Sequence, residues 1–303
     1  LPYKNGYLST VCCDIAIKIK ERIMSIKEKL ESMRRNSIVL KIAKKEKYIK
    51  CATRFGGQPD VPSDIVWPTF EGESYDGVVK DRPLTFIAQF NCADLAPYDT
   101  EHLLPDHGLL SFFYETDVQP WGYNPKDKGG ARVYWFEDLS KLSAADFPVD
   151  MEEDFKFPMI KIKVSNQISL PGWEDFTEKY VGETDDDDEF EEIREKLGVE
   201  EPDECSKMLG WADTIQGSMP IECELIQRGY YLGDGWKNIP EEVCKQAKEE
   251  ALDHWVLLFQ LDMVECGDFE LMFGDSGRIY YYITKEDLLA RRFDRVWLML
   301  QCC

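Results

Sequence analysis

The second half of this chain of 303 residues repeats a pattern found in its first half. Residues 83–91 form an apolar run that is broken by Gln89 and closed by an asparagine. Residues 254–262 form a similar run, which is broken by Gln260 and closed by an aspartate. Short runs rich in aromatic and branched side chains are typical of buried strands. The chain therefore carries two predicted strands of the same design.

Two further segments follow each of these strands in the same order. A turn with Gly108 lies 19 residues after Gln89, and a turn with Gly277 lies 17 residues after Gln260. Each turn leads into a second apolar run, and a third run closes each copy. Shared order and spacing predict an internal duplication. Because a three-stranded unit has open edges and one apolar face, we expect both copies to form one pseudo-twofold α+β globule. The predicted repeats cover about residues 83–136 and 254–299.

The N-terminal part differs from the rest in charge and in hydrophobic pattern. Between residues 12 and 33, apolar or small side chains recur at intervals of four and three, and Lys and Glu fill most other positions. The pattern predicts an amphipathic helix within a basic segment, residues 1–36, added to a single domain, residues 37–303. We expect the apolar stripe to dock on the domain. A weak dimer through this helix is the alternative to a monomer.

The formal net charge of −22 limits the possible partners. Residues 1–50 carry a net charge of +8, so residues 51–303 carry −30. Such a body is not expected to bind nucleic acid, because phosphate contacts require clustered Lys and Arg. A basic protein partner would complement it.

The hydropathy of the chain and its cysteines indicate in which cellular compartment we expect the protein. We recognise no secretory signal in this sequence and no apolar run long enough for a membrane helix, so we expect a cytoplasmic protein that does not enter a membrane. Ten scattered cysteines without a CxxC pair, together with only three histidines, predict free thiols and no metal site.

The remaining pattern predicts further elements and two irregular loops. The expected strands are at residues 37–42, 48–53 and 157–164, with a terminal strand at 295–301 inside the sheet. The expected helices are at residues 174–180 and about 240–253. One loop runs from Arg54 to Pro62 and ends near Trp67, and the other runs from Leu209 to Met219 and carries Trp211. Both are rich in glycine, which permits unusual backbone angles.

Several segments share motifs with a known family. These are Arg54-x-Gly56-Gly57-x-Pro59-x-x-Pro62 with Trp67-Pro68, Phe86-Ile87-Ala88-Gln89, Leu209-Gly210 with Ile215-Gln216-Gly217, Leu258-Phe259-Gln260-Leu261-Asp262, and Phe273-Gly274-Asp275-x-Gly277-Arg278. With these motifs, the chain from about residue 37 to its C-terminus resembles the YwqG-like family of bacterial proteins. The resemblance implies an α+β domain without an established enzymatic activity. After Gly210 the chain has Trp-Ala-Asp, where the family pattern has His and Pro.

No pairing of a nucleophile with a base stands out. Ser276 lies between Asp275 and Gly277 in ordinary turn sequence, and His107 stands at the corresponding turn of the first repeat. The two turns would form a composite site only if both faced one cleft. We therefore assign no catalytic residue, metal ion or cofactor. Enzymatic activity stays open, and a non-catalytic binding protein of immunity or regulatory type is preferred.

A glutamine inside an apolar strand needs a partner, because an unpaired buried polar group costs about 1–3 kcal/mol. Gln89 and Gln260 either hold loop backbone, which is the preferred reading, or line a central pocket. For a binding protein we expect an acidic, aromatic-rich contact face that includes both irregular loops. The alternative is a small-molecule site or active site in a cleft between the repeats, near Arg54, Gln89 and Gln260. The candidate binding residues are Arg54, Trp67, Gln89, Trp211, Gln216, Gln260 and Asp275.

Overall fold

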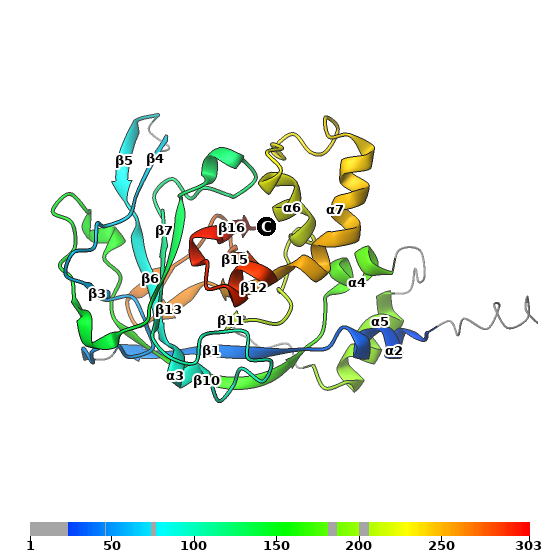
Figure 1. The fold of residues 1–303 in the computed structure, drawn as a ribbon, viewed down its shortest axis with the longest axis horizontal. Coiled ribbons are helices and arrows are strands. Elements are labelled where there is room, and N and C mark those ends of the chain that lie inside the picture. Colours follow the sequence, from blue (N-terminus) through cyan, green and yellow to red (C-terminus); the bar gives the residue numbers. More distant parts are fainter. Residues whose placement is uncertain (1–23, 46, 74–76, 181–186, 200–205) are drawn as a thin grey trace, which may run out of the picture.

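The computed structural model describes residues 24–45, 47–73, 77–180, 187–199 and 206–303. Antiparallel strands dominate the fold, and most of the helices gather at one end (Figure 1). Ten strands form one sheet in the order β16-β15-β12-β11-β1-β10-β2-β6-β7-β8. In chain order these strands are β1 (Arg35–Lys45), β2 (Arg54–Phe55), β6 (Thr85–Asn91), β7 (Leu109–Tyr114), β8 (Ala131–Phe136), β10 (Ile160–Ser169), β11 (Lys207–Met208), β12 (Trp255–Leu261), β15 (Arg278–Thr284) and β16 (Trp297–Gln301).

Shorter elements decorate this sheet. Three two-stranded ribbons are formed by β3 (Asp60–Pro62) with β9 (Leu142–Ala144), β4 (Thr69–Glu73) with β5 (Val79–Pro83), and β13 (Val264–Cys266) with β14 (Phe269–Leu271). The α-helices are α2 (Ile26–Ser32), α3 (Cys92–Leu95), α4 (Trp173–Lys179), α5 (Asp187–Lys196), α6 (Pro220–Gln227), α7 (Glu241–His254) and α8 (Lys285–Leu289). Single 3₁₀ turns lie at Pro125–Asp127, Leu139–Lys141, Glu153–Phe155 and Phe293–Arg295. The chain is thus an α+β protein.

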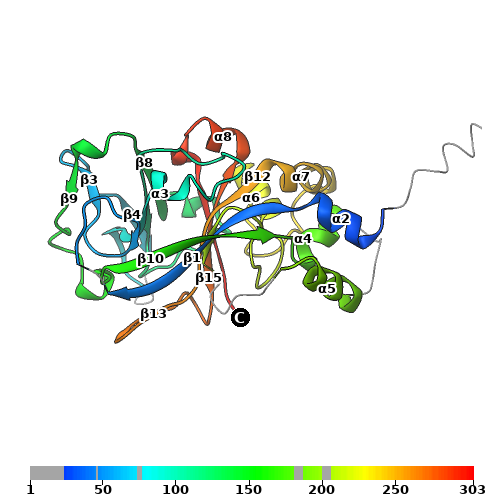
Figure 2. The same ribbon diagram turned by 90° about the horizontal axis from the view of Figure 1, so that it is seen from below.

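The two longest strands lie in the middle of the sheet. Strands β1 and β10 pair from Arg35 opposite Ser169 to Lys45 opposite Ile160, and Figure 2 shows them crossing the molecule together. On its other side β1 carries the short strand β11, and β10 carries the short strand β2. Beyond each short strand follows a three-stranded wing, β12-β15-β16 on one side and β6-β7-β8 on the other.

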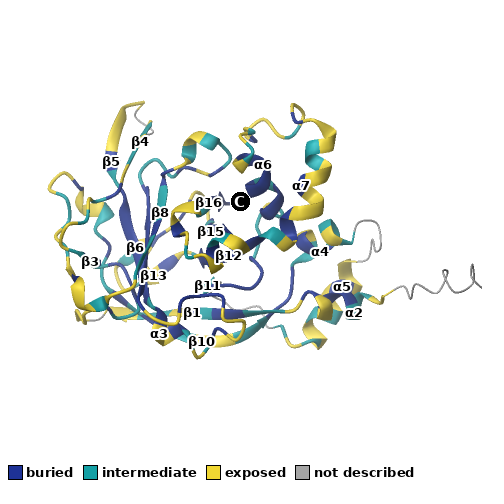
Figure 3. Cartoon of the chain, viewed as in Figure 1, coloured by how far each residue is buried: buried dark blue, intermediate teal, exposed yellow. Residues whose placement is uncertain are grey.

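The two wings share one aromatic core. Phe112 in β7 meets Phe259 in β12 at 4.9 Å between ring centroids, and it meets Tyr281 in β15 at 5.1 Å. Phe90 in β6 also contacts Phe259, at 5.2 Å. The Tyr281 hydroxyl donates a hydrogen bond to the carbonyl oxygen of Phe113 in the opposite wing. Figure 3 shows that burial is concentrated in the wings and on α6, whereas the outer side of α7 is exposed.

The structure confirms some predicted elements and corrects others. All six apolar runs of the proposed repeats are strands, and α4 and α7 match the predicted helices to within one residue. The predicted strand at 48–53 is wrong, because β1 pairs with the distant β10 instead. The terminal strand β16 is at the edge of the sheet and not inside it. Its outer side meets a loop, where the Leu300 N–H donates to the Trp121 carbonyl oxygen.

The predicted N-terminal helix is seen only in its last part, since residues 12–23 lie outside the described residues. Helix α2 begins with a capping box formed by Ser25 and Glu28. Leu30 of this helix is fully buried beside Phe190 of α5 and Trp211. Strand β1 begins at Arg35, before the predicted domain start at residue 37. The described end of the helix is therefore docked on the body, as the stripe predicted.

Candidate functional site

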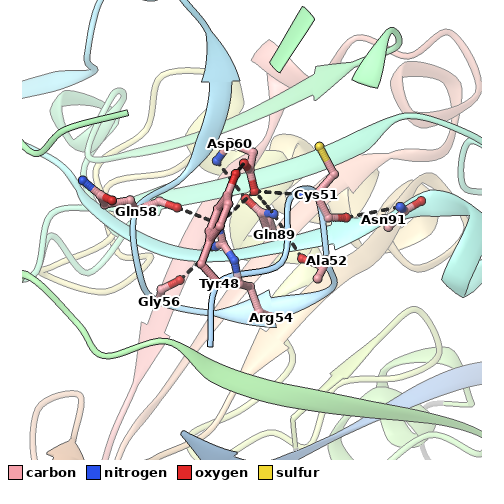
Figure 4. Close-up of polar contacts among 9 residues, drawn as sticks. All are labelled: Tyr48, Cys51, Ala52, Arg54, Gly56, Gln58, Asp60, Gln89 and Asn91. Atoms are coloured by element: carbon pink, nitrogen blue, oxygen red, sulfur yellow. Dashed lines mark hydrogen bonds and ion pairs between the residues drawn. The ribbon is translucent and has the colours of Figure 1, made fainter. Parts of the chain in front are cut away.

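A sealed polar cluster joins β2, the loop after it and β6 (Figure 4). Arg54 Nη2 lies 2.9 Å from Asp60 Oδ2. Gln89 accepts a hydrogen bond from the Asp60 backbone N–H at 3.0 Å and donates to Asp60 Oδ2 at 2.8 Å. The guanidinium also donates to the carbonyl oxygens of Gly56 and Gln58, at 3.0 and 2.6 Å. We call Arg54, Asp60 and Gln89 the closed cluster.

Burial dominates the electrostatics of the closed cluster. The side chains of Arg54 and Asp60 are 2% and 0% exposed. Desolvation lowers the pKa of Arg54, and the charge of Asp60 opposes this shift. Tyr48 donates its hydroxyl to Asp60 at 2.7 Å, and partial burial together with this bond raises the pKa of Tyr48 to about 12. Because the backbone N–H of Cys51 also donates to Asp60, the carboxylate fastens three chain segments together.

A second cluster repeats this chemistry at the molecular surface. Lys207 Nζ lies 2.6 Å from Asp213 Oδ2. Gln260 accepts from the Asp213 backbone N–H at 2.9 Å and donates to Asp213 Oδ2 at 2.9 Å. The side chains of Lys207 and Asp213 are 12% and 29% exposed. We call Lys207, Asp213 and Gln260 the open cluster.

The loops of the two clusters have the same length and the same backbone shape. Six positions separate Arg54 from Asp60 and also Lys207 from Asp213. In the first loop Gly56 and Gly57 have φ of 58° and 74°, and in the second loop Leu209 and Gly210 have φ of 60° and 77°. This left-handed region favours glycine, so Leu209 adopts it at a cost in strain. Each loop thereby brings its aspartate back over the glutamine of the neighbouring wing.

Further side chains fix the backbone beyond Asp213. Gln301 of β16 accepts from the backbone N–H groups of Ile215 and Gln216, at 2.9 and 3.1 Å, and donates to the carbonyl oxygen of Gly217 at 3.0 Å. Tyr280 donates its hydroxyl to the Asp213 carbonyl oxygen at 2.8 Å. The residues from Asp213 to Ser218 nevertheless remain partly or fully exposed.

Both ends of the 209–219 loop are anchored in the core. Trp211 is 4% exposed, and its Nε1 donates to the Met33 carbonyl oxygen at 2.7 Å. The Arg35 guanidinium stacks 3.6 Å from the centre of the Trp211 ring. At the other end Ser218 donates its hydroxyl to the buried Asp175 at 2.6 Å. Burial raises the pKa of Asp175 to about 6, against the effects of Ser218 and Arg35.

The structure separates the residues that the sequence suggested as a site. Arg54 and Gln89 belong to the closed cluster, whereas Gln260 belongs to the open one, and the aromatic core fills the space between the wings. The half-buried Trp67 donates from Nε1 to the Leu84 carbonyl oxygen and packs edge-on against Phe113. Gln216 is exposed on the 209–219 loop.

The two turns of the proposed composite site have separate surroundings. His107 lies between Asp106, at 2.6 Å, and Glu137, at 3.5 Å, and these two acids raise the pKa of the imidazole. The exposed Asp275 accepts from the Cys303 backbone N–H through its carbonyl oxygen. Among the described residues, no hydrogen bond or ion pair joins these two turns.

Four residues that form or support the two clusters are not among the candidates from the sequence: Asp60, Lys207, Asp213 and Arg278. A signal for three of them was present, because both loops have a cation, five intervening residues that include glycine, and an aspartate. Arg278 could not be found in this way. Its Nη1 donates to the Asp213 carbonyl oxygen at 3.2 Å while its Nε lies 3.1 Å from Asp262.

Other features of the described residues bear on chemistry. In that part of the chain, no group of three or more His, Cys, Asp or Glu side chains is arranged to hold a metal ion. The seven cysteines in it are unbridged. None of its helices combines the length and the apolar composition that crossing a bilayer requires.

The fold and its two clusters define an α+β protein whose irregular loops are held by buried polar side chains. Residues 53–302 match the family model described as a domain of unknown function, DUF1963. The chain belongs to this family. A comparison with curated proteins gives no match.

Proposed function

We propose that the protein is a cytoplasmic, non-catalytic binding protein and that it docks a protein partner on the 209–219 loop. One observation carries the proposal: this loop is fixed by Gln260, Gln301 and Tyr280 but presents residues 213–218 at the surface. A loop held in its bound shape loses little conformational entropy when a partner docks, and this lowers the cost of association.

Charge favours a basic partner. The net charge of residues 51–303 is −30, and the acids close to the loop include Asp213, Glu174 and Asp262. Lys207 and Arg278 are engaged by Asp213 and Asp262, so they offer little net positive potential. Complementary charge would raise the association rate and make binding weaken with salt.

We also infer that the chain is a YwqG-like member of its family and that its two wings arose by duplication. The matching order of strands on both sides of β1 and β10 supports this inference, as do the equal loops of the two clusters. On this view one cluster was kept as a structural fastening. The other became the support of a contact surface.

The test compares two double variants. Thr214→Ala/Gln216→Ala removes side chains from the loop surface, and Thr100→Ala/Gln227→Ala removes the same residue types from exposed positions elsewhere. Partners are recovered from cytoplasmic extract at low and high salt, and the purified partner is titrated calorimetrically. We expect the loop variant to weaken binding about tenfold, equivalent to about 1.4 kcal/mol, and the control to bind as the wild type does.

Equal binding by both variants would contradict the proposed surface. Turnover of a small molecule by the purified protein, abolished by Asp275→Ala or His107→Ala, would favour the enzyme alternative instead.

A further inference from the structure

In the part of the chain that the structure describes, one edge of the strand β10 is paired over only a small part of its length. Along one side it pairs with β1 over its full length, but on the other side it pairs with β2 only at Ile160 and Lys161. Within the described ranges no strand pairs with the rest of this side. Unpaired strand edges present backbone donors and acceptors to any extended chain that fits against them.

The direction of the free backbone groups follows from neighbouring bonds. The Gly56 N–H donates to Ile87 in β6, whereas the Gly57 N–H donates to Phe157 on the β10 side. Backbone groups therefore alternate between the two neighbours, and those of Phe55 face Ile160. By the same alternation along β10, Ile162 and Val164 direct their N–H and C=O groups to the unpaired side.

This edge lines a surface groove of about 480 Å³. The residues that line the groove include Ile162, Val164 and Ile49, and Ile49 is 54% exposed. The other residues around it are Ala52, Thr53, Ala93, Asp94, Pro97, Tyr98 and Lys161. Asn166 closes one end by donating to the Tyr98 carbonyl oxygen at 2.8 Å. Strand residues rise by about 3.3 Å each, so an extended peptide of the same number of residues can lie alongside the stretch from Ile162 to Ser165.

Charges of both signs lie at the groove, and lysines outnumber acids once the chain neighbours of the lining residues Ile49 and Ile162 are included. Lys161 lines the groove, and the exposed Lys50 and Lys163 are chain neighbours of lining residues. Asp94 accepts the Thr53 hydroxyl at 2.7 Å. Three lysines at and beside the groove, against one lining aspartate, would favour an acidic segment on a chain whose net charge is otherwise −22.

The outer edge of β1, the other central strand, is covered by other segments of the chain. On the outer side of β1, the Leu40 N–H donates to the carbonyl oxygen of Ser206, just before β11. Strand β13 also packs near β1. Described segments of the chain thus cover the outer edge of β1, whereas none of them forms a strand beside Ile162–Ser165 of β10.

We propose that the groove along Ile162–Ser165 binds an acidic, extended peptide segment of a partner protein by strand addition. Main-chain hydrogen bonds to Ile162 and Val164 would supply affinity, and the lysines would select for acidic side chains. This site is separate from the 209–219 loop, and each proposal can fail without the other.

The probe is the fluorescein-labelled peptide Asp-Val-Glu-Val-Asp-Val-Glu, followed by fluorescence anisotropy with the full chain. We expect a Kd below about 100 μM, and at least about tenfold weaker binding when all internal amides of the peptide are N-methylated. Replacing its acids by lysine should also weaken binding at least about tenfold. Lys161→Glu, at a residue that lines the groove, should weaken binding of the original peptide, whereas Lys237→Glu, an exposed control, should not.

Hydrogen exchange locates the bound peptide. The amide protons of Ile162 and Val164 should exchange more slowly in the complex, while those of Lys163 and Ser165, which face β1, should change little. Absence of binding at about 1 mM peptide, equal binding of the N-methylated peptide, or protection confined to another region would each overturn the proposal.

Discussion

The closed and open clusters show how one loop design can serve two purposes. In both, a glutamine from a wing strand holds the backbone and the carboxylate of an aspartate, and a cation six residues earlier completes the arrangement. Asp60 is fully covered, whereas the side chain of Asp213 is 29% exposed. The same bonds therefore fasten a core in one half and support a surface loop in the other.

Because the two clusters differ in burial, we expect them to contribute differently to the free energy of unfolding. A buried charge that loses its partner is strongly unfavourable, because water cannot replace the lost interaction. An ion pair near solvent contributes little, because water and salt screen it. The two clusters should therefore respond differently to the same substitutions.

The largest contrast is expected for the two cations. Arg54→Met leaves the carboxylate of Asp60 buried and without its counter-charge, so the free energy of unfolding should fall by about 3–5 kcal/mol. Lys207→Met should lower it by about 1 kcal/mol or less. Urea denaturation of both variants measures the difference. Similar losses would show that the open cluster is as essential to folding as the closed one.

The dependence of the free energy of unfolding on pH should reveal the contribution of Asp175, which anchors the 209–219 loop. Because the pKa of Asp175 is about 6 in the folded state and lower in the unfolded chain, the folded state binds more protons between about pH 4 and pH 6. This group's contribution to the free energy of unfolding should therefore decrease as pH rises through that window, by up to about 3 kcal/mol.

Asp175→Asn should remove this component, and Asp64→Asn, at an exposed position, should leave it in place. Amide hydrogen exchange of the wild type should also distinguish the region of Asp175 from the closed cluster. Raising the pH leaves a charged carboxylate in the buried site of Asp175, so protection from exchange should fall more in the backbone around Asp175 than at Gly56 in the closed cluster. Identical profiles for the wild type and Asp175→Asn would remove Asp175 as the cause.

The smallest expected effect comes from the two glutamines. Gln89→Leu leaves the buried Asp60 N–H without an acceptor and should cost about 1–3 kcal/mol. Gln260→Leu should cost less, because the neighbourhood of Asp213 is partly open and water can take the place of the amide. Thermal unfolding of both variants measures the order, and a larger loss for Gln260→Leu would reverse the comparison.

Much of the sheet could be predicted from the sequence, because its strands carry local signals. The apolar runs around Gln89 and Gln260 are strands with the same kind of irregularity, between Phe86 and Ala88 and between Leu257 and Phe259. Helix α7 was equally clear from its first-turn acids. The partner of β1 could not be predicted, since more than a hundred residues separate it from β10 and pattern alone does not specify pairing.

The candidate site was only partly predictable. The sequence singles out Gln89, Gln260 and both irregular loops, but it leaves a common pocket open as an alternative to separate roles. Whether the two glutamines meet depends on which face of each strand points inward. Burial of Phe90 and Phe259 between the wings turns both glutamines towards the loops instead.

The sequence by itself determined the strands, the glycine-rich loops, the acidic charge and the need of each buried glutamine for a hydrogen-bond partner. These properties follow from side-chain chemistry and local backbone freedom. Only the tertiary structure decided that Asp60 is sealed, that Asp213 stays near solvent and that, among the described residues, no strand pairs with most of one edge of β10. Exposure is set by which distant segments pack over a position, and the sequence around Asp60 and Asp213 does not record that packing.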